Sequence, residues 1–213
     1  DRVTGNVSKY ARQAKVIHID IDKAEINKII KTEAFIHADA KEALVALIDV
    51  CKPNKHPDWI AAFANLNKQE LDKVINPEFN APGELRMAEV INTLSDLTNG
   101  SAVVVSDVGQ HQMITSRYYR LKHPRTHITS GGAGTMGFAL PAAMGAALAV
   151  PEKNVVAVIG DGGYQMTIQE LGTIMQYEIP VKILVLNNNF LGMVRQWQQL
   201  FHGKRYSFTE MDN

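Results

Sequence analysis

The pattern of hydrophobic and polar residues in the first part of the chain predicts a small unit that contains strand and helix. Residues 15–22 alternate in the manner of a strand and end in acidic residues. Residues 23–31 and 40–50 carry apolar side chains at helical spacing. Two prolines among polar residues at 51–57 then predict a break, so we expect a domain to end there.

The rest of the chain begins with predicted helices and continues with strands that alternate with helices. The first predicted helix covers residues 58–75, and the second covers 84–97 and is followed by Asn99-Gly100, a typical helix stop. The predicted strands cover 101–109, 154–160 and 181–187, and the later helices cover 112–119, 138–150, 165–177 and 191 onward. Alternating strands and helices favour a parallel sheet with helices on both faces, so the predicted fold class is α/β.

Composition and charge exclude several classes of protein. Lys plus Arg and Asp plus Glu each number 22, so the formal net charge is zero and nothing indicates a nucleic-acid or membrane partner. Hydrophobic residues make up 46% of the 213, which is typical of a globular protein. The single Cys51 excludes an internal disulfide framework and fits a reducing cytoplasm, and we expect it to be a buried thiol.

Acidic and amide side chains follow two of the predicted strands. Asp161 comes directly after the apolar strand 154–160, and Asn187-Asn188-Asn189 follow the strand that begins at Val181. If these strands are neighbours, their ends lie about 4.8 Å apart at one edge of the sheet. One carboxylate, one amide oxygen and a nearby carbonyl are ligands that Mg²⁺ accepts together with water and phosphate oxygens. The pattern predicts a metal and diphosphate site.

Two other interpretations of these glycine-rich stretches are considered. Asp161 can instead cap a helix while the asparagines form a turn, and on the residues alone both interpretations stay open. A G-x-G-x-x-G match at Gly132, Gly134 and Gly137 raises a dinucleotide site. Residues 122–129 before it contain proline and charges and make a poor buried strand, so close helix packing and backbone approach explain these glycines better.

The spacing as a whole resembles a known signature. Gly160-Asp161-Gly162, followed after 24 residues by Asn187-Asn188, is similar to the motif of thiamine-diphosphate enzymes. Further stretches, spread over nearly the whole chain and in the same order, resemble the large catalytic subunit of acetolactate synthase (acetohydroxyacid synthase). They are DRVTG, HIDID, DVGQHQM, SGGAGTMGFALPAA, GDGGYQMTIQELGT and NNNFLGMVRQWQQLF.

The resemblance implies three parts and an incomplete chain. Residues 1–52 would be the C-terminal part of a FAD-binding-type middle domain, 53–80 a helical linker, and 81–213 the N-terminal part of a thiamine-diphosphate-binding domain. The chain begins at Asp1 without a methionine, and we expect it to be an internal fragment of a longer protein.

The resemblance also implies three cofactors, thiamine diphosphate, Mg²⁺ and FAD. Asp161 and the Asn188 side chain would bind Mg²⁺, with the Phe190 carbonyl as the third protein ligand. Met193 and Trp197 would shape the pocket for the second substrate. The residues implied to line the thiamine diphosphate site are Val108, Gly109, Gln110, His111, Gly134, Met136, Gly160, Asp161, Gly162, Gly163, Asn188, Met193 and Val194. The residues implied to contact FAD are Arg2, Asp20 and Asp39; Asp20 replaces a residue that is often Glu in the family.

The implied activity is decarboxylation of pyruvate and carboligation to a second 2-keto acid, pyruvate or 2-ketobutyrate, in branched-chain amino acid biosynthesis. The family activates its cofactor with a Glu from the N-terminal domain of a neighbouring subunit. Glu170 does not match that role, so we expect no catalytic residue of this kind here and an inactive isolated chain. A homo-oligomer, dimer or tetramer, and a small regulatory subunit are the implied partners. A catabolic acetolactate synthase, a pyruvate oxidase or a non-catalytic interaction fragment are the alternatives.

Overall fold

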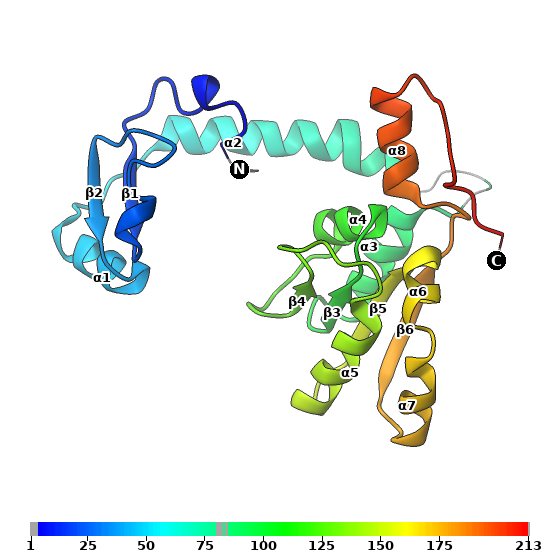
Figure 1. Ribbon diagram of the computed structural model, residues 1–213. Coiled ribbons are helices and arrows are strands. Elements are labelled where there is room, and N and C mark those ends of the chain that lie inside the picture. The colour runs from blue at the N-terminus through cyan, green and yellow to red at the C-terminus, as the bar shows by residue number, and fades with distance from the viewer. Residues whose placement is uncertain (1–3, 80–82, 84, 213) are drawn as a thin grey trace. The chain divides into compact units, whose positions relative to one another are not determined.

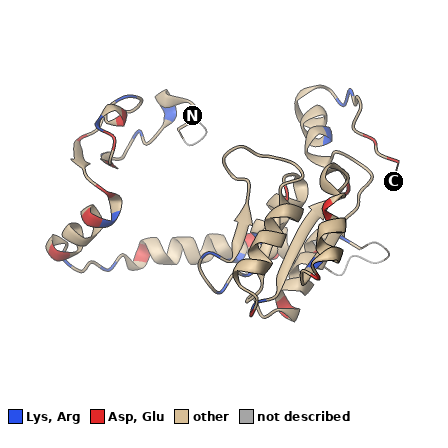
Figure 2. Cartoon of the chain, turned by 60° about the horizontal axis from the view of Figure 1, so that its bottom comes forward, with Lys and Arg blue, Asp and Glu red and all other residues tan. Residues whose placement is uncertain are grey.

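The computed structural model describes residues 4–79, 83 and 85–212. The chain forms two compact units, Asp1–Phe63 and Ala64–Asn213, and their boundary falls inside the predicted linker 53–80. Each unit contains its own parallel sheet (Figure 1). Acidic and basic residues are interspersed in both units (Figure 2). In the part of the chain that is described, helices are too short or too polar to cross a membrane.

The first unit is built around two short parallel strands. β1 (Ile17–Asp20) pairs with β2 (Ala34–His37) so that Ile17 lies opposite Ala34. The 3₁₀ turns are η1 (Val7–Lys9) and η2 (Lys23–Glu25), and the helices are α1 (Ala40–Val50) and the beginning of α2 (Pro57–Glu70). The strand and the helix predicted at 15–22 and 40–50 are therefore present.

The helix predicted at 23–31 is wrong, and β2 was not predicted. Only the 3₁₀ turn η2 forms there, and Asn27 has a left-handed backbone with φ of 62°. The Asn27 side chain accepts hydrogen bonds from the Thr32 N–H at 2.8 Å and the Thr32 hydroxyl at 2.9 Å. Such side-chain bonds compete with helical ones and turn the chain into β2, which is too short to show a pattern.

The second unit contains a four-stranded parallel sheet in the order β4-β3-β5-β6. Its strands are β3 (Val103–Ser106), β4 (His127–Thr129), β5 (Val155–Gly160) and β6 (Val181–Leu186). β5 and β6 are neighbours, and Gly160 lies opposite Leu186. The strand ends that carry Asp161 and the asparagines therefore meet at one edge, as the sequence predicts.

Helices cover both faces of this sheet. α3 (Met87–Leu97) and α4 (Gln110–Tyr118) pack on the face that contains Val104 and Val158. α5 (Ala139–Ala149) and α7 (Glu170–Gln176) pack on the face that contains Val105 and Ala157. The remaining elements are η3 (Leu71–Ile75), η4 (Asn76–Glu78), α6 (Asp161–Thr167) and α8 (Gly192–Phe201). This is the predicted α/β class.

Several local predictions in this unit are corrected. The single helix predicted at 165–177 is the pair α6 and α7, and α6 already begins at Asp161. Residues 122–129 do contain a strand, β4, which tolerates the preceding proline and charges because it is short and lies at the sheet edge. The apolar pattern of the helix predicted at 165–177 also predicts Met166 and Met175 in the helix core, but both are exposed. Cys51 in the first unit, expected to be buried, is exposed as well.

Candidate functional site

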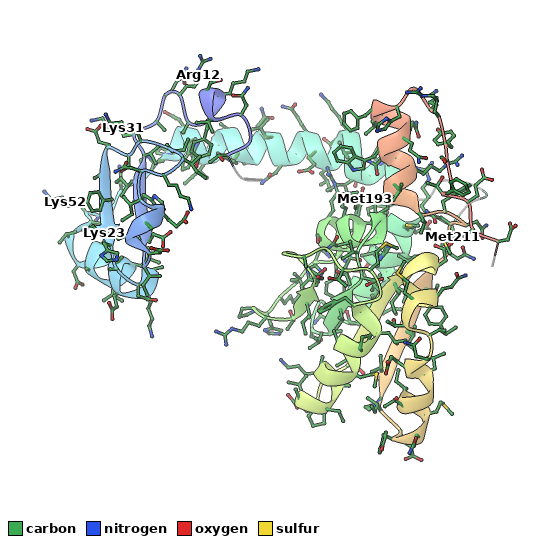
Figure 3. All side chains as sticks on the ribbon, in the orientation of Figure 1. Arg12, Lys23, Lys31, Lys52, Met193 and Met211 are labelled. Atoms are coloured by element: carbon green, nitrogen blue, oxygen red, sulfur yellow. The ribbon has the colours of Figure 1, made fainter. Side chains whose placement is uncertain are left out.

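A cavity of about 350 Å³ lies at the carboxyl ends of β3, β5 and β6. This is the edge at which open parallel sheets bind ligands. Each of the residues predicted for thiamine diphosphate, Mg²⁺ or the second substrate lines it. The residues that line it without having been predicted are Met87, Leu186, Leu191 and Gly192. In Figure 3, Met193 lies in the first turn of α8.

Glycines form the floor of the cavity because buried side chains leave no room for a Cβ atom. A Cβ at Gly160 would lie 2.8 Å from the His111 ring, and one at Gly109 would lie 2.7 Å from it. A Cβ at Gly163 would lie 1.8 Å from Asp107 Oδ2. Glycine at these positions lets the polar backbone, including that of the first turn of α6, face the cavity directly.

Asp161 is the first residue of α6, directly after β5, and only 5% of its surface is exposed. Asn188 reaches the same cavity from the loop after β6. Its Oδ1 atom accepts a hydrogen bond from the Phe190 N–H at 3.1 Å, and its amide donates to Gln110 Oε1 at 3.4 Å. A carbonyl oxygen has two lone pairs, so Asn188 Oδ1 can also serve as a ligand.

The cavity therefore offers oxygen ligands of the kind that Mg²⁺ prefers. Within the described residues, no three His, Cys, Asp or Glu side chains gather into a metal cluster. A site made from one carboxylate, one amide and one backbone carbonyl does not need such a cluster. Asp161, Asn188 and Phe190, the three residues predicted to provide these groups, all line the cavity.

His111 lies on α4 under the cavity and is 6% exposed. Its Nε2 atom is buried and has no hydrogen-bond partner among the described residues. Burial lowers the pKa of His111, and the negative charges of Asp107 and Asp161 oppose this shift. A buried nitrogen without a partner at a ligand cavity is the kind of atom that a bound group satisfies.

We expect the burial of His111 to lower the free energy of unfolding as the pH falls below about 6.5, the unperturbed pKa of histidine. Between the unperturbed pKa and the lowered pKa of the folded state, the His111 ring binds a proton in the unfolded chain but not in the folded one. The free energy of unfolding therefore decreases as the pH falls through this range. Nuclear magnetic resonance titration of the His111 ring in the metal-free chain measures this. The same ring in denaturant is the control, and a folded pKa at or above the denatured value would contradict the expectation.

The loop after β6 is held from outside by the C-terminal residues. The Leu191 N–H donates to the Thr209 carbonyl at 2.8 Å, and the Met211 N–H donates to the Asn189 carbonyl at 2.9 Å. The Arg195 guanidinium lies 4.2 Å from the Phe190 ring centroid. Met211 is labelled in Figure 3, and its sulfur would lie 3.0 Å from a Cβ at Gly162. These contacts fix the backbone around Phe190.

Two of the residues predicted for FAD lie near the paired ends of β1 and β2, where Asp20 lies opposite His37 and the Ala38 N–H donates to the Asp20 carbonyl at 3.2 Å. Asp20 lines a separate cavity of about 290 Å³ in the first unit, together with His18. Its Oδ1 accepts from the Asp22 N–H at 2.8 Å, and this bond is the main cause that lowers the pKa of Asp20. Asp39 caps α1 by accepting from the Lys41 N–H at 2.8 Å. Arg2 lies outside the described residues.

Asp107 was not predicted as a site residue, although it comes directly after β3 and is fully buried. The available signal was an acid at the end of an apolar strand, the same signal that drew attention to Asp161. Met87 and Leu186 gave no signal, because an apolar residue on a helix or strand looks alike whether it faces a core or a cavity.

Comparison with known proteins agrees with this architecture. Residues 107–213 match the model of the thiamine pyrophosphate enzyme C-terminal TPP binding domain, and residues 1–47 match that of the thiamine pyrophosphate enzyme central domain. The first match begins directly after β3 and contains β5, β6 and all of the cavity lining except Met87.

Relatives in several bacteria match the chain from end to end. It is 46% identical over 213 residues to the acetolactate synthase large subunit of Lactococcus lactis subsp. lactis, covering 100% of this chain and 36% of that protein. It is 43% identical to the acetolactate synthase large subunit of Buchnera aphidicola subsp. Schizaphis graminum, covering 100% of this chain and 37% of that one. Identity to the acetolactate synthase isozyme 3 large subunit of Escherichia coli is 42%, covering 100% and 38%.

The chain thus spans little more than a third of the length of these relatives. The two family models match it in the order central domain and then TPP binding domain, and the second covers half of its residues. On this evidence of sequence, fold and cavity, the chain belongs to the thiamine pyrophosphate enzyme family.

Proposed function

We propose that this chain is the cofactor-binding portion of an acetolactate synthase. The reaction would decarboxylate pyruvate and join its two-carbon remainder to a second 2-keto acid, pyruvate or 2-ketobutyrate, in branched-chain amino acid biosynthesis. The observation that carries the proposal is the single cavity shared by Asp161, Asn188 and Trp197. Sequence identity of 42% to 46% to acetolactate synthase large subunits supports this activity over others in the family.

The residues of the cavity fit thiamine diphosphate and Mg²⁺. Asp161, Asn188 and the Phe190 carbonyl would hold the metal, and the metal would hold the diphosphate. Gly162 and Gly163 have no side chains that could block the phosphate oxygens from the backbone. The unsatisfied, buried Nε2 of His111 offers one further polar contact. When bound, thiamine diphosphate supplies the electron sink for decarboxylation and carbon–carbon bond formation.

The other side of the cavity is apolar and would orient the organic parts. Met136 enters from the loop before α5, and Met193 and Val194 enter from the first turn of α8. Trp197 follows one turn later and is 57% exposed, so it would form the outer wall for the second 2-keto acid. Apolar contact discriminates one methylene by only about 1–3 kcal/mol, so preference for 2-ketobutyrate would be moderate.

We extend the proposal to FAD and to partners. The cavity beside Asp20 supports a FAD site in the first unit, with Arg2 and Asp39 as further expected contacts. The whole protein would work as a homo-oligomer, with a regulatory subunit, in the cytoplasm. These points follow from the resemblance to acetolactate synthase and remain predictions.

The test of the proposed function is a chimera. The matching segment of the Lactococcus lactis large subunit, 46% identical, is replaced by this chain, and acetolactate formation from pyruvate is measured. We expect activity within about tenfold of the parent subunit, because this chain has the carboxylate, amide and apolar residues that the proposed reaction needs around one cavity. The isolated chain should form no acetolactate, because the activating Glu is expected outside it. An inactive but folded chimera would contradict the proposal.

A further inference from the structure

Asp107 makes two hydrogen bonds that the proposed chemistry does not use. Its Oδ2 atom accepts from the Gly137 N–H at 3.0 Å, and its Oδ1 atom accepts from the Ala139 N–H at 3.2 Å. The residue is fully buried at the end of β3 and lies 30 residues before its first partner in the chain. One carboxylate oxygen therefore accepts from the loop before α5, and the other accepts from the first residue of α5.

These bonds replace a helix cap that the local sequence lacks. α5 begins at Ala139, and the residue at its N-cap position, Phe138, makes no side-chain hydrogen bond. The first N–H groups of a helix need acceptors, and a negative charge is favoured at that end by the helix dipole. Asp107 provides both from the neighbouring strand.

The backbone that Asp107 caps directly follows a loop that lines the cavity. Residues 130–138 form the loop between β4 and α5, and Gly134 and Met136 from this loop line the cavity. The loop has local bonds of its own, such as the Thr135 N–H to Ser130 Oγ at 3.1 Å. Thr167 Oγ1 donates to the Gly137 carbonyl at 3.0 Å. Asp107 is the charged group among these contacts and ties the end of the loop to the central sheet.

We propose that Asp107 is a positioning residue that holds the loop of Gly134 and Met136 in place for the ring portion of thiamine diphosphate. The inference rests on the proposed cofactor site. It goes beyond that proposal because Asp107 does not line the cavity and acts only through the loop. Its hydrogen-bond partners Gly137 and Ala139 adjoin the loop that is expected at the ring portion, whereas Asp161 and Asn188 are expected at the diphosphate. The two halves of the ligand should therefore respond differently.

The substitution Asp107→Asn separates the hydrogen bonds from simple packing. Asparagine has nearly the same shape, so the contact of Asp107 with the first turn of α6 at Gly163 is kept. It presents one oxygen and one NH₂ group, however, and the NH₂ group would face a backbone N–H donor. One bond and the negative charge are lost. Asp72→Asn, at an exposed position, makes the same change of charge and is the matched control.

Two measurements on the full 213-residue chain test the inference. Amide hydrogen exchange at Gly137 and Ala139 is followed without ligand. Calorimetric titration compares thiamine diphosphate with inorganic pyrophosphate, both with Mg²⁺. For Asp107→Asn we expect exchange about tenfold faster and thiamine diphosphate binding about tenfold weaker, with pyrophosphate binding within about twofold of wild type. Asp72→Asn should match wild type in the exchange rate and in the affinities for both ligands.

The alternative outcomes separate this inference from the proposed function. If wild type binds thiamine diphosphate and Asp107→Asn binds it equally well, the positioning role is overturned while the cofactor site stands. If Asp107→Asn weakens both ligands to the same extent, the residue supports the fold in general and the inference is wrong. If folded wild type binds pyrophosphate but gains nothing from the thiamine portion, the proposed cofactor and the positioning role fall together.

Discussion

Asp161→Ala is expected to weaken Mg²⁺-dependent binding of thiamine diphosphate by about a hundredfold or more. Asp161 supplies the carboxylate of the proposed metal ligands and is 5% exposed at the start of α6. Asn188 and Phe190 would offer only neutral oxygens. Without the negative charge, the metal would lose its strongest protein contact and the diphosphate its counterion.

Calorimetric titration of thiamine diphosphate with and without Mg²⁺ measures this effect. Asp72→Ala removes an exposed aspartate from the same unit and should leave the affinity within about twofold of wild type. Circular dichroism of both variants controls for folding. Saturable binding by Asp161→Ala at wild-type affinity would show that the metal site lies elsewhere.

Gly163→Ala is expected to destabilise the second unit by about 3 kcal/mol or more. The new Cβ atom would lie 1.8 Å from Asp107 Oδ2, and real Cβ contacts are never so short. That oxygen cannot move away freely, because it accepts the Gly137 N–H and is fully buried. Either the hydrogen bond from the Gly137 N–H to Asp107 breaks or the first turn of α6 shifts, and each change disturbs the cavity.

Gly145→Ala is the matched control for this change. Gly145 lies inside α5, is exposed, and nothing lies within 4 Å of a Cβ placed on it. Alanine in a helix interior is favoured over glycine by about 1 kcal/mol, so this variant should be slightly more stable than wild type. Urea unfolding compares the two, and equal stability of Gly163→Ala and wild type would contradict the expected clash.

The glycine-rich loop shows how far local patterns reach. The match at Gly132, Gly134 and Gly137 is identical in letters to a dinucleotide motif, but here it follows the three-residue edge strand β4. The match of residues 107–213 to a TPP binding domain supports thiamine diphosphate, and not a dinucleotide, as the cofactor of the domain that contains these glycines. A short motif therefore needs its position in the sheet before its ligand can be named.

The errors in the sequence analysis also have physical causes. The helix predicted at 23–31 failed because Asn27 bonds to Thr32 and takes a left-handed backbone. Met166 and Met175 have core-like side chains but lie on the outer surfaces of α6 and α7. Hydrophobic spacing reports that a helix has two faces, but not whether another element covers the apolar one.

The sequence by itself determined that β3, β5 and β6 alternate with helices in the second unit, and that Asp161 and Asn188 meet at one edge of the sheet if β5 and β6 are neighbours. A continuous apolar strand such as β5 favours burial on both faces, and the ends of neighbouring parallel strands meet at one edge. Only the tertiary structure decided that Asp107 caps α5, because that bond joins residues whose distance in the chain leaves no local pattern. It also decided which glycines are required, since a missing Cβ atom matters only where another buried group occupies its place.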